Sequence, residues 1–117
     1  MKKLLVVDDN LEYLGFLSSV LEKCFEVYTA TGVKDALRLL DNEKVEAICS
    51  DFNMQDGTGL DLLEDIRQKG ITVPFLLMSG GDDCLLEQQT KLYAGVFCYK
   101  TDYDLIAKIK ALINPKP

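Results

Sequence analysis

Short runs of consecutive apolar residues alternate along this chain with stretches in which apolar residues recur every three or four positions. Unbroken runs are typical of strands buried on both faces, and the spaced pattern is typical of helices that bury one side. The predicted strands cover residues 4–7, 25–29, 45–49, 75–78 and 96–99. A helical pattern follows each of them, so the chain is predicted to repeat a strand and a helix five times.

Residues that favour helix ends lie at the expected boundaries. Thr58 and Asp61 have the spacing of a capping box before the third helix, and Gly70 is expected to end that helix. The other expected helix ends are Thr31, Asp82 or Asp83, the capping-box pattern of Thr101 and Asp104, and Pro115.

A strand and a helix in regular alternation predict an α/β fold with a parallel sheet. Crossovers between parallel strands are right-handed, so helices cover both faces and the sheet is doubly wound and open. In such sheets ligands bind beyond the carboxyl ends of the strands. We expect residues 1–117 to form one domain of this kind.

Composition narrows the choice of partners. Thirteen basic residues against nineteen acidic ones give a net charge of −6, which repels nucleic acid and anionic lipid on average. No apolar run approaches the roughly 20 residues that span a bilayer. We therefore expect a cytoplasmic domain that binds neither nucleic acid nor membrane directly.

The chain contains no histidine, which removes Ser-His and Cys-His nucleophilic pairs and imidazole metal sites. Its four cysteines form no C-x-x-C pair, and we expect them to be reduced and mostly packed in the core. Any chemistry must come from carboxylates, hydroxyls, lysines or thiols.

Polar residues of these types follow four of the predicted strands. Asp8 and Asp9 end the first, Asp51 the third, Ser79 the fourth and Lys100 the fifth. Clustered carboxylates repel one another, and a hard divalent cation such as Mg²⁺ relieves that repulsion. A carboxylate nucleophile beside a cation, a lysine and a hydroxyl indicates phosphoryl transfer to aspartate.

Each residue also has a simpler explanation. Asp8 or Asp9 could cap the first helix, Asp51 could be an ordinary loop acid, and Lys100 could be a surface lysine. Ser79, which precedes two glycines, could be a turn residue. Their joint position at the ends of four strands favours the shared site.

Four segments resemble the receiver domains of response regulators in two-component signalling, and the resemblance covers the whole chain. They are LLVVDDN at 4–10, SDFNMQDGTGLDLL at 50–63, FLLMSG at 75–80 and AGVFCYK at 94–100. The resemblance implies a flavodoxin-like (βα)5 fold with strand order 2-1-3-4-5.

The resemblance also implies a function for individual residues. Asp51 matches the phosphoacceptor, and Lys100 and Ser79 match the groups that contact the phosphoryl group and serve its transfer. The implied metal site for Mg²⁺ or Mn²⁺ consists of Asp8, Asp9, Asp51 and the backbone carbonyl of Asn53. Gly80 matches a position where small residues leave the aspartate accessible.

Phe97 matches the aromatic residue that changes rotamer on phosphorylation. In this family the change remodels a partner-binding face made by the fourth helix, the fifth strand and the fifth helix, which here would include Leu92 and Tyr99. An aromatic residue in a strand is often a permanent part of the core instead. Permanent packing is therefore the alternative explanation for Phe97.

Two positions depart from the family pattern. Thr101 replaces the proline that usually follows the lysine, and Gln55 replaces the proline that usually follows Met54. Without proline the peptide bond after Lys100 is expected to be trans, because a cis bond costs about 2.5–4 kcal/mol there. Neither change removes a charged group from the predicted site.

The implied function is a phosphoacceptor domain that catalyses only its own phosphorylation and dephosphorylation, and so is not an enzyme in the usual sense. Its implied partners are a sensor histidine kinase or histidine phosphotransfer protein as donor, and a downstream protein or output domain as target. The main alternative is a receiver-like interaction module that works without phosphate. A haloacid-dehalogenase-type hydrolase fits poorly because residues 8–11 lack the D-x-D-x-[TV] pattern, and acids in the first loop argue against a flavin carrier.

Overall fold

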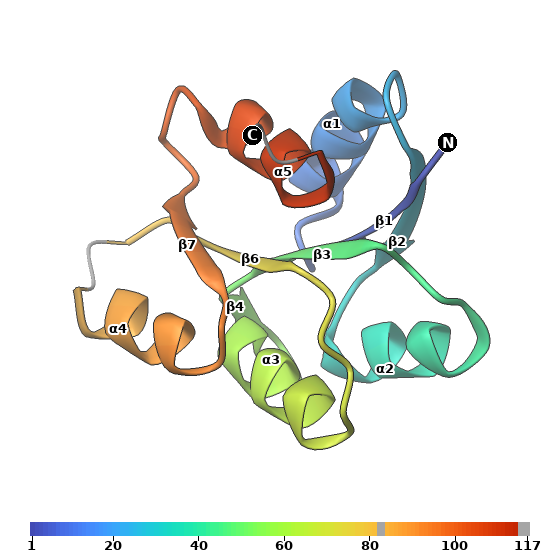
Figure 1. The fold of residues 1–117 in the computed structure, drawn as a ribbon. Helices are drawn as coiled ribbons and strands as arrows, with labels where there is room; N and C mark the ends of the chain where they lie inside the picture. Colours follow the sequence, from blue (N-terminus) through green and yellow to red (C-terminus); the bar gives the residue numbers. More distant parts are fainter. Residues whose placement is uncertain (82–83, 115–117) are drawn as a thin grey trace.

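The computed structural model describes residues 1–81 and 84–114, which form a central parallel sheet covered by helices on both faces (Figure 1). The sheet strands are β1 (Lys3–Val7), β2 (Glu26–Ala30), β3 (Ala47–Asp51), β6 (Phe75–Ser79) and β7 (Val96–Tyr99). The helices are α1 (Leu11–Leu21), α2 (Val33–Asn42), α3 (Gly59–Gln68), α4 (Cys84–Leu92) and α5 (Leu105–Ile113). A small hairpin, β4 (Asn53–Met54) and β5 (Gly57–Thr58), lies between β3 and α3.

The strand order is β2-β1-β3-β6-β7, and every neighbouring pair in this sheet is parallel. Counted along the sheet strands alone, this is the predicted order 2-1-3-4-5. Helices α1 and α5 cover one face, and α2, α3 and α4 cover the other (Figure 1). The predicted doubly wound α/β fold is therefore confirmed.

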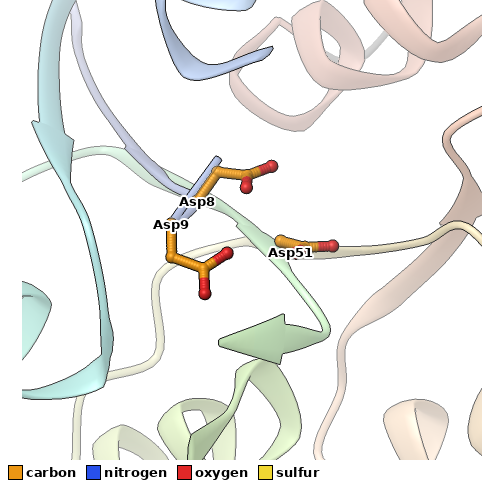
Figure 2. A group of neighbouring side chains, drawn as sticks. All are labelled: Asp8, Asp9 and Asp51. Carbon is orange, nitrogen blue, oxygen red and sulfur yellow. The ribbon is translucent and has the colours of Figure 1, made fainter. Parts of the chain in front are cut away.

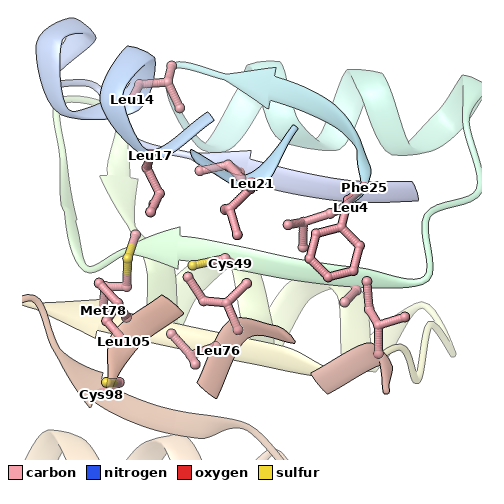
Figure 3. Close-up of a cluster of buried hydrophobic side chains, with 14 residues drawn as sticks. Leu4, Leu14, Leu17, Leu21, Phe25, Cys49, Leu76, Met78, Cys98 and Leu105 are labelled. Carbon is pink, nitrogen blue, oxygen red and sulfur yellow. The ribbon is translucent and has the colours of Figure 1, made fainter. Parts of the chain in front are cut away.

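Alternation along the strands builds one apolar cluster on each face of the sheet. Leu4 and Val6 of β1 belong to the cluster beneath α1 and α5, whereas Leu5 and Val7 belong to the cluster above α2, α3 and α4. The first cluster also contains Cys49, Cys98 and Met78 (Figure 3). Two cysteines thus have the expected packing function, while Cys24 and Cys84 are exposed free thiols.

Helix α3 begins and ends as the sequence predicts. The Thr58 hydroxyl accepts the backbone N–H of Asp61, and the Asp61 carboxylate accepts the backbone N–H of Thr58, at 3.0 Å each. Gly70 has a φ of 83°, a left-handed conformation that glycine adopts without strain. The capping box and the glycine stop are both confirmed.

Two predicted helix starts are wrong. Helix α2 begins at Val33 with Gly32 at the N-cap, and the carboxylate of Asp56 accepts the N–H groups of Val33 and Lys34, so Thr31 is not the cap. Helix α5 begins at Leu105, because the Asp102 carboxylate accepts the Asp104 N–H and holds the preceding residues in a turn. The other expected helix ends, Asp82 or Asp83 and Pro115, lie outside the described residues.

No cis peptide bond occurs in residues 1–81 and 84–114, as expected for Thr101 after Lys100. Within the same residues, none of the helices is both long enough and apolar enough to cross a membrane.

Candidate functional site

Three aspartates converge at the carboxyl edge of the sheet. Strands β1 and β3 are neighbours with Val7 opposite Ser50, so Asp8 and Asp9 follow one strand where Asp51 ends the other. One carboxylate oxygen of each lies within 4.8 Å of the others (Figure 2). The predicted meeting of the strand ends is therefore present for the acids.

The first of these acids is held by the backbone around it. Asp8 is fully buried, its N–H donates to the Ala30 carbonyl at 3.1 Å, and one of its carboxylate oxygens accepts the Asn10 N–H at 2.9 Å. Asn10 in turn caps α1 by accepting the Tyr13 N–H at 3.1 Å. Asp8 therefore does not cap the helix itself, and its other oxygen faces the site.

Asp51 is packed against the start of α3. A methyl group at Gly59 would lie 2.4 Å from the Asp51 carbonyl oxygen and 2.5 Å from the side chain of Leu77. The Gly59 N–H donates to the Phe52 carbonyl at 2.8 Å. Only glycine fits this close approach, which keeps the phosphoacceptor candidate at a fixed distance from α3.

Lys100 completes the cluster from the end of β7. Its ammonium group lies 2.9 Å from Asp8 and 3.2 Å from Asp51, and its side chain is only 21% exposed. Burial lowers the pKa of Lys100, but hydrogen bonding and the charges of the two aspartates outweigh it, so the pKa is raised. Lys100 therefore stays charged and cannot be an ordinary surface lysine.

Burial raises the pKa of Asp51, and the negative charge of Asp8 raises it further, although Lys100 opposes both effects. One lysine thus offsets only part of the repulsion among the carboxylates. The remaining negative charge, with several carboxylate oxygens within reach of one ion, fits a hard divalent cation such as Mg²⁺ or Mn²⁺.

The other predicted residues lie around this cluster. Ser79 ends β6, one position past Met78, which is paired with Asp51, and its hydroxyl accepts the Gly81 N–H at 3.1 Å. Asn53 is exposed in β4, two residues beyond Asp51. A methyl group at Gly80 would meet nothing within 4 Å, so the space beside Ser79 is open.

Phe97 lies in β7 and is half-buried against the cluster above α2, α3 and α4. Its ring packs edge-on against the ring of Tyr99, with the centroids 5.0 Å apart. Leu92 is 80% exposed at the end of α4. The predicted partner face therefore includes an exposed apolar residue in α4 and a partly exposed aromatic residue in β7.

Sequence reasoning missed Tyr13, Asp56 and Gly59. Tyr13 lies with its ring 4.3 Å from the Lys100 ammonium, and Asp56 caps α2 from the hairpin. The tyrosine among the apolar residues of α1 was a signal that could have drawn attention to Tyr13, whereas the pairing of Asp56 with α2 has no local signal.

A family model described as the response regulator receiver domain matches residues 4–101. Among similar curated proteins, the CpxR homolog of Haemophilus influenzae, a transcriptional regulatory protein, is 34% identical over 97% of this chain and 51% of its own length. The two-component response regulator ARR11 of Arabidopsis thaliana is 39% identical over 66% of this chain and 15% of its own length. The chain thus spans about half the length of the first of these relatives and much less of the second.

Two solved structures show the same fold. The receiver domain of Francisella response regulator 1452 matches 97% of this chain and 98% of its own with a TM-score of 0.90 and 23% identity. The chemotaxis response regulator CheY4 of Vibrio cholerae matches 96% and 98% with a TM-score of 0.86 and 24% identity.

Proposed function

The chain belongs to the response regulator receiver domain family of two-component signalling, and on this premise we propose that Asp51 accepts a phosphoryl group in a reaction that depends on a divalent cation. The observation that carries the proposal is the position of Asp51, which lies within reach of Asp8 and Asp9 and 3.2 Å from the Lys100 ammonium. A nucleophilic carboxylate, two further acids and one lysine are the groups that phosphoryl transfer to aspartate needs.

The proposed metal ligands are Asp8, Asp9, Asp51 and the backbone carbonyl of Asn53. Mg²⁺ or Mn²⁺ bound there would neutralise the carboxylates and the oxygens of the incoming phosphoryl group. The raised pKa of Asp51 and the shared negative charge of the cluster support this proposal.

In the proposed reaction a carboxylate oxygen of Asp51 forms a bond to phosphorus as the bond from phosphorus to the donor nitrogen breaks. The electron pair of that bond stays on the donor imidazole. Lys100 then pairs with a phosphoryl oxygen in place of part of its contact with Asp51. In the structure the Ser79 hydroxyl donates to the Gly81 carbonyl over 3.4 Å. A bond this long is weak enough to be exchanged for one to the phosphoryl group.

We propose that the bound phosphoryl group acts on partners through Phe97. Movement of Ser79 toward Asp51 would vacate space beside β7, and the half-buried Phe97 ring would rotate inward to fill it. The face formed by α4, β7 and α5 would then change shape for a downstream target. Permanent packing of Phe97 in the core remains the competing explanation, and the partial exposure of its ring favours the switch.

The proposed phosphoryl donor is a sensor histidine kinase or a histidine phosphotransfer protein, and the target is a downstream protein or an output domain. The proposed receiver domain covers residues 1–117 and is cytoplasmic. Because the family members are signalling domains, we propose that this one catalyses only its own phosphorylation and dephosphorylation. A phosphate-independent docking module is less favoured, because all the site groups of the family are present.

The test is incubation with phosphoramidate and Mg²⁺, followed by the intact mass of the protein. We expect a mass gain of one phosphoryl group that is absent with EDTA and in Asp51→Asn. The matched control is Asp41→Asn, which removes the same charge from an exposed position in α2 and is expected to react like the wild type. No mass gain, combined with no detectable binding of Mg²⁺ or beryllofluoride, would contradict the proposal and favour the docking module.

A further inference from the structure

The ring of Tyr13 forms one wall around the ammonium group of Lys100. The ammonium nitrogen lies 4.3 Å from the centroid of the ring, well inside the range of a cation–π contact. The same nitrogen contacts Asp8 at 2.9 Å and Asp51 at 3.2 Å. Lys100 is therefore held between two carboxylates and an aromatic face.

Hydrogen bonds fix the backbone position from which this ring projects. The Tyr13 N–H donates to the side chain of Asn10 at 3.1 Å, and the Asn10 N–H donates to one carboxylate oxygen of Asp8 at 2.9 Å. The other oxygen of Asp8 accepts Lys100. Asp8, Asn10, Tyr13 and Lys100 thus form a closed circuit in which the first turn of α1 and the lysine are anchored on one buried carboxylate.

Lys100 needs such a support because its side chain is a flexible four-carbon stem that bears a point charge. The Lys100 N–H donates to the Ser79 carbonyl at 2.9 Å, which fixes where the stem begins but not where it points. Thr101 follows it, so no proline ring restricts the backbone after the lysine. The Tyr13 ring restricts the ammonium end of the side chain.

The Tyr13 ring is also the one of these three contacts that a divalent cation or a phosphoryl group does not compete for. Asp8 and Asp51 are proposed metal ligands, and a cation there would weaken the hold of both on Lys100. The face of an aromatic ring does not ligate Mg²⁺, which prefers carboxylate oxygens and water. Tyr13 would therefore keep Lys100 in place when the aspartates are occupied.

We propose that Tyr13 is a positioning residue, whose ring face holds the Lys100 ammonium beside Asp51 so that it meets the incoming phosphoryl group. The inference rests on the function proposed above. The ring face carries the effect and the phenolic hydroxyl does not, because the contact runs from the ammonium to the ring centroid.

The test compares Tyr13→Leu and Tyr13→Phe by the rate of phosphorylation with phosphoramidate and Mg²⁺. A desolvated cation–π contact predicts a loss of about tenfold in Tyr13→Leu. Tyr13→Phe is expected to stay within about twofold of the wild type, because it keeps the ring. The matched control is Tyr103→Leu, which removes a fully exposed tyrosine in the loop before α5 and is expected to leave the rate unchanged.

A second measurement reports the contact itself. Because the Lys100 ammonium lies over the ring, we expect an upfield NMR shift of the methylene protons next to it in the wild type and Tyr13→Phe, and loss of this shift in Tyr13→Leu. A thermal unfolding curve shows that each variant is folded, and Tyr13→Met replaces Tyr13→Leu if the latter is not.

The outcomes separate the two proposals. A wild type that is phosphorylated while Tyr13→Leu reacts at the same rate overturns the positioning inference alone. A loss as large in Tyr13→Phe as in Tyr13→Leu also overturns it, because the hydroxyl would then carry the effect. A wild type that takes up no phosphoryl group and binds neither Mg²⁺ nor beryllofluoride overturns both the proposed function and this inference.

Discussion

The centre of the sheet and its carboxyl edge belong to the same strands but differ in what they bury. At the centre, Ile48 and Leu77 are fully buried among apolar side chains, which stabilises the fold by roughly 25 cal/mol for each Å² removed from water. At the edge, Asp8 is fully buried and Asp51 nearly so, next to a single lysine. The difference shows that burial at the centre stabilises the fold, whereas the clustered carboxylates at the edge destabilise it and are kept for chemistry.

The largest expected effect on stability comes from a substitution at the centre of the sheet. Ile48→Ala leaves a cavity in the cluster above α2, α3 and α4 and is expected to lower the free energy of unfolding by about 2–5 kcal/mol. Ile48→Val, the matched control, removes one methylene group and is expected to cost about 0.5–1.5 kcal/mol. Urea unfolding measures both, and a cost for Ile48→Ala no greater than that for Ile48→Val would show that the centre is not tightly packed.

The next effect acts on the edge through the proposed cation. Mg²⁺ that binds the folded state alone raises the free energy of unfolding by about 2.7 kcal/mol at a concentration 100-fold above its Kd. Asp9→Asn removes a proposed ligand and is expected to lose most of this gain, whereas Asp41→Asn is expected to keep it. Thermal unfolding at constant ionic strength measures the gain, and an equal rise in wild type and Asp9→Asn would argue against a site that uses Asp9.

A smaller effect concerns the charge of Asp51 without metal. Burial and Asp8 raise the pKa of Asp51 above its value in the unfolded chain, so the protonated carboxyl favours the folded state and the ionised carboxylate disfavours it. The stability that the protonated form contributes is therefore lost as pH rises through the folded pKa. Asp51→Asn is therefore expected to be more stable than the wild type at neutral pH in EDTA.

The same difference is expected to vanish in acid, below the unfolded pKa of an aspartate, where the wild-type carboxyl is protonated in both states. Urea unfolding of both proteins across pH measures it. A wild type more stable than Asp51→Asn at neutral pH would mean that the ion pair with Lys100 outweighs burial and repulsion.

The smallest effect concerns an exposed acid outside the cluster. Asp56 accepts the N–H groups of Val33 and Lys34 at 2.9 and 3.0 Å, and these bonds hold its pKa below the usual range. Asp56→Ala leaves both groups without this cap and is expected to cost about 0.5–1 kcal/mol, the lower part of the range for helix caps. Because the folded pKa is lowered, this cost shrinks as pH falls through it.

Urea unfolding measures the cost, and faster hydrogen exchange of the first amides of α2 would place it at the helix start. Asp41→Ala, at the other end of the same helix, is the control. An Asp56→Ala variant as stable as that control would show that the cap contributes nothing. Asp56 and Asp51 together sharpen the comparison between stability and chemistry. A carboxylate stabilises the fold where it accepts N–H groups, as Asp56 does, and destabilises it where it faces another acid, as Asp51 does.

Much of the fold and of the site follows from the sequence alone. Apolar runs predicted the five strands, of which β1, β3 and β6 are buried along almost their whole length. The strand order placed Asp8 beside Asp51 once the sheet was parallel. The capping box of Thr58 and the glycine stop at Gly70 were predictable because every group involved lies within a few residues of its partner. Periodicity and local hydrogen bonding are properties of neighbouring residues, so the sequence determines them directly.

The tertiary structure decided the details in which distant residues meet. The α2 cap comes from Asp56, more than 20 residues along the chain, and so the local candidate Thr31 was wrong. The contact of Tyr13 with Lys100 joins the first helix to the last strand, and the close approach of Gly59 to Asp51 depends on how α3 packs on β3. Such contacts depend on the separation and angle of packed elements, which are set by the whole core at once and by no short stretch of sequence.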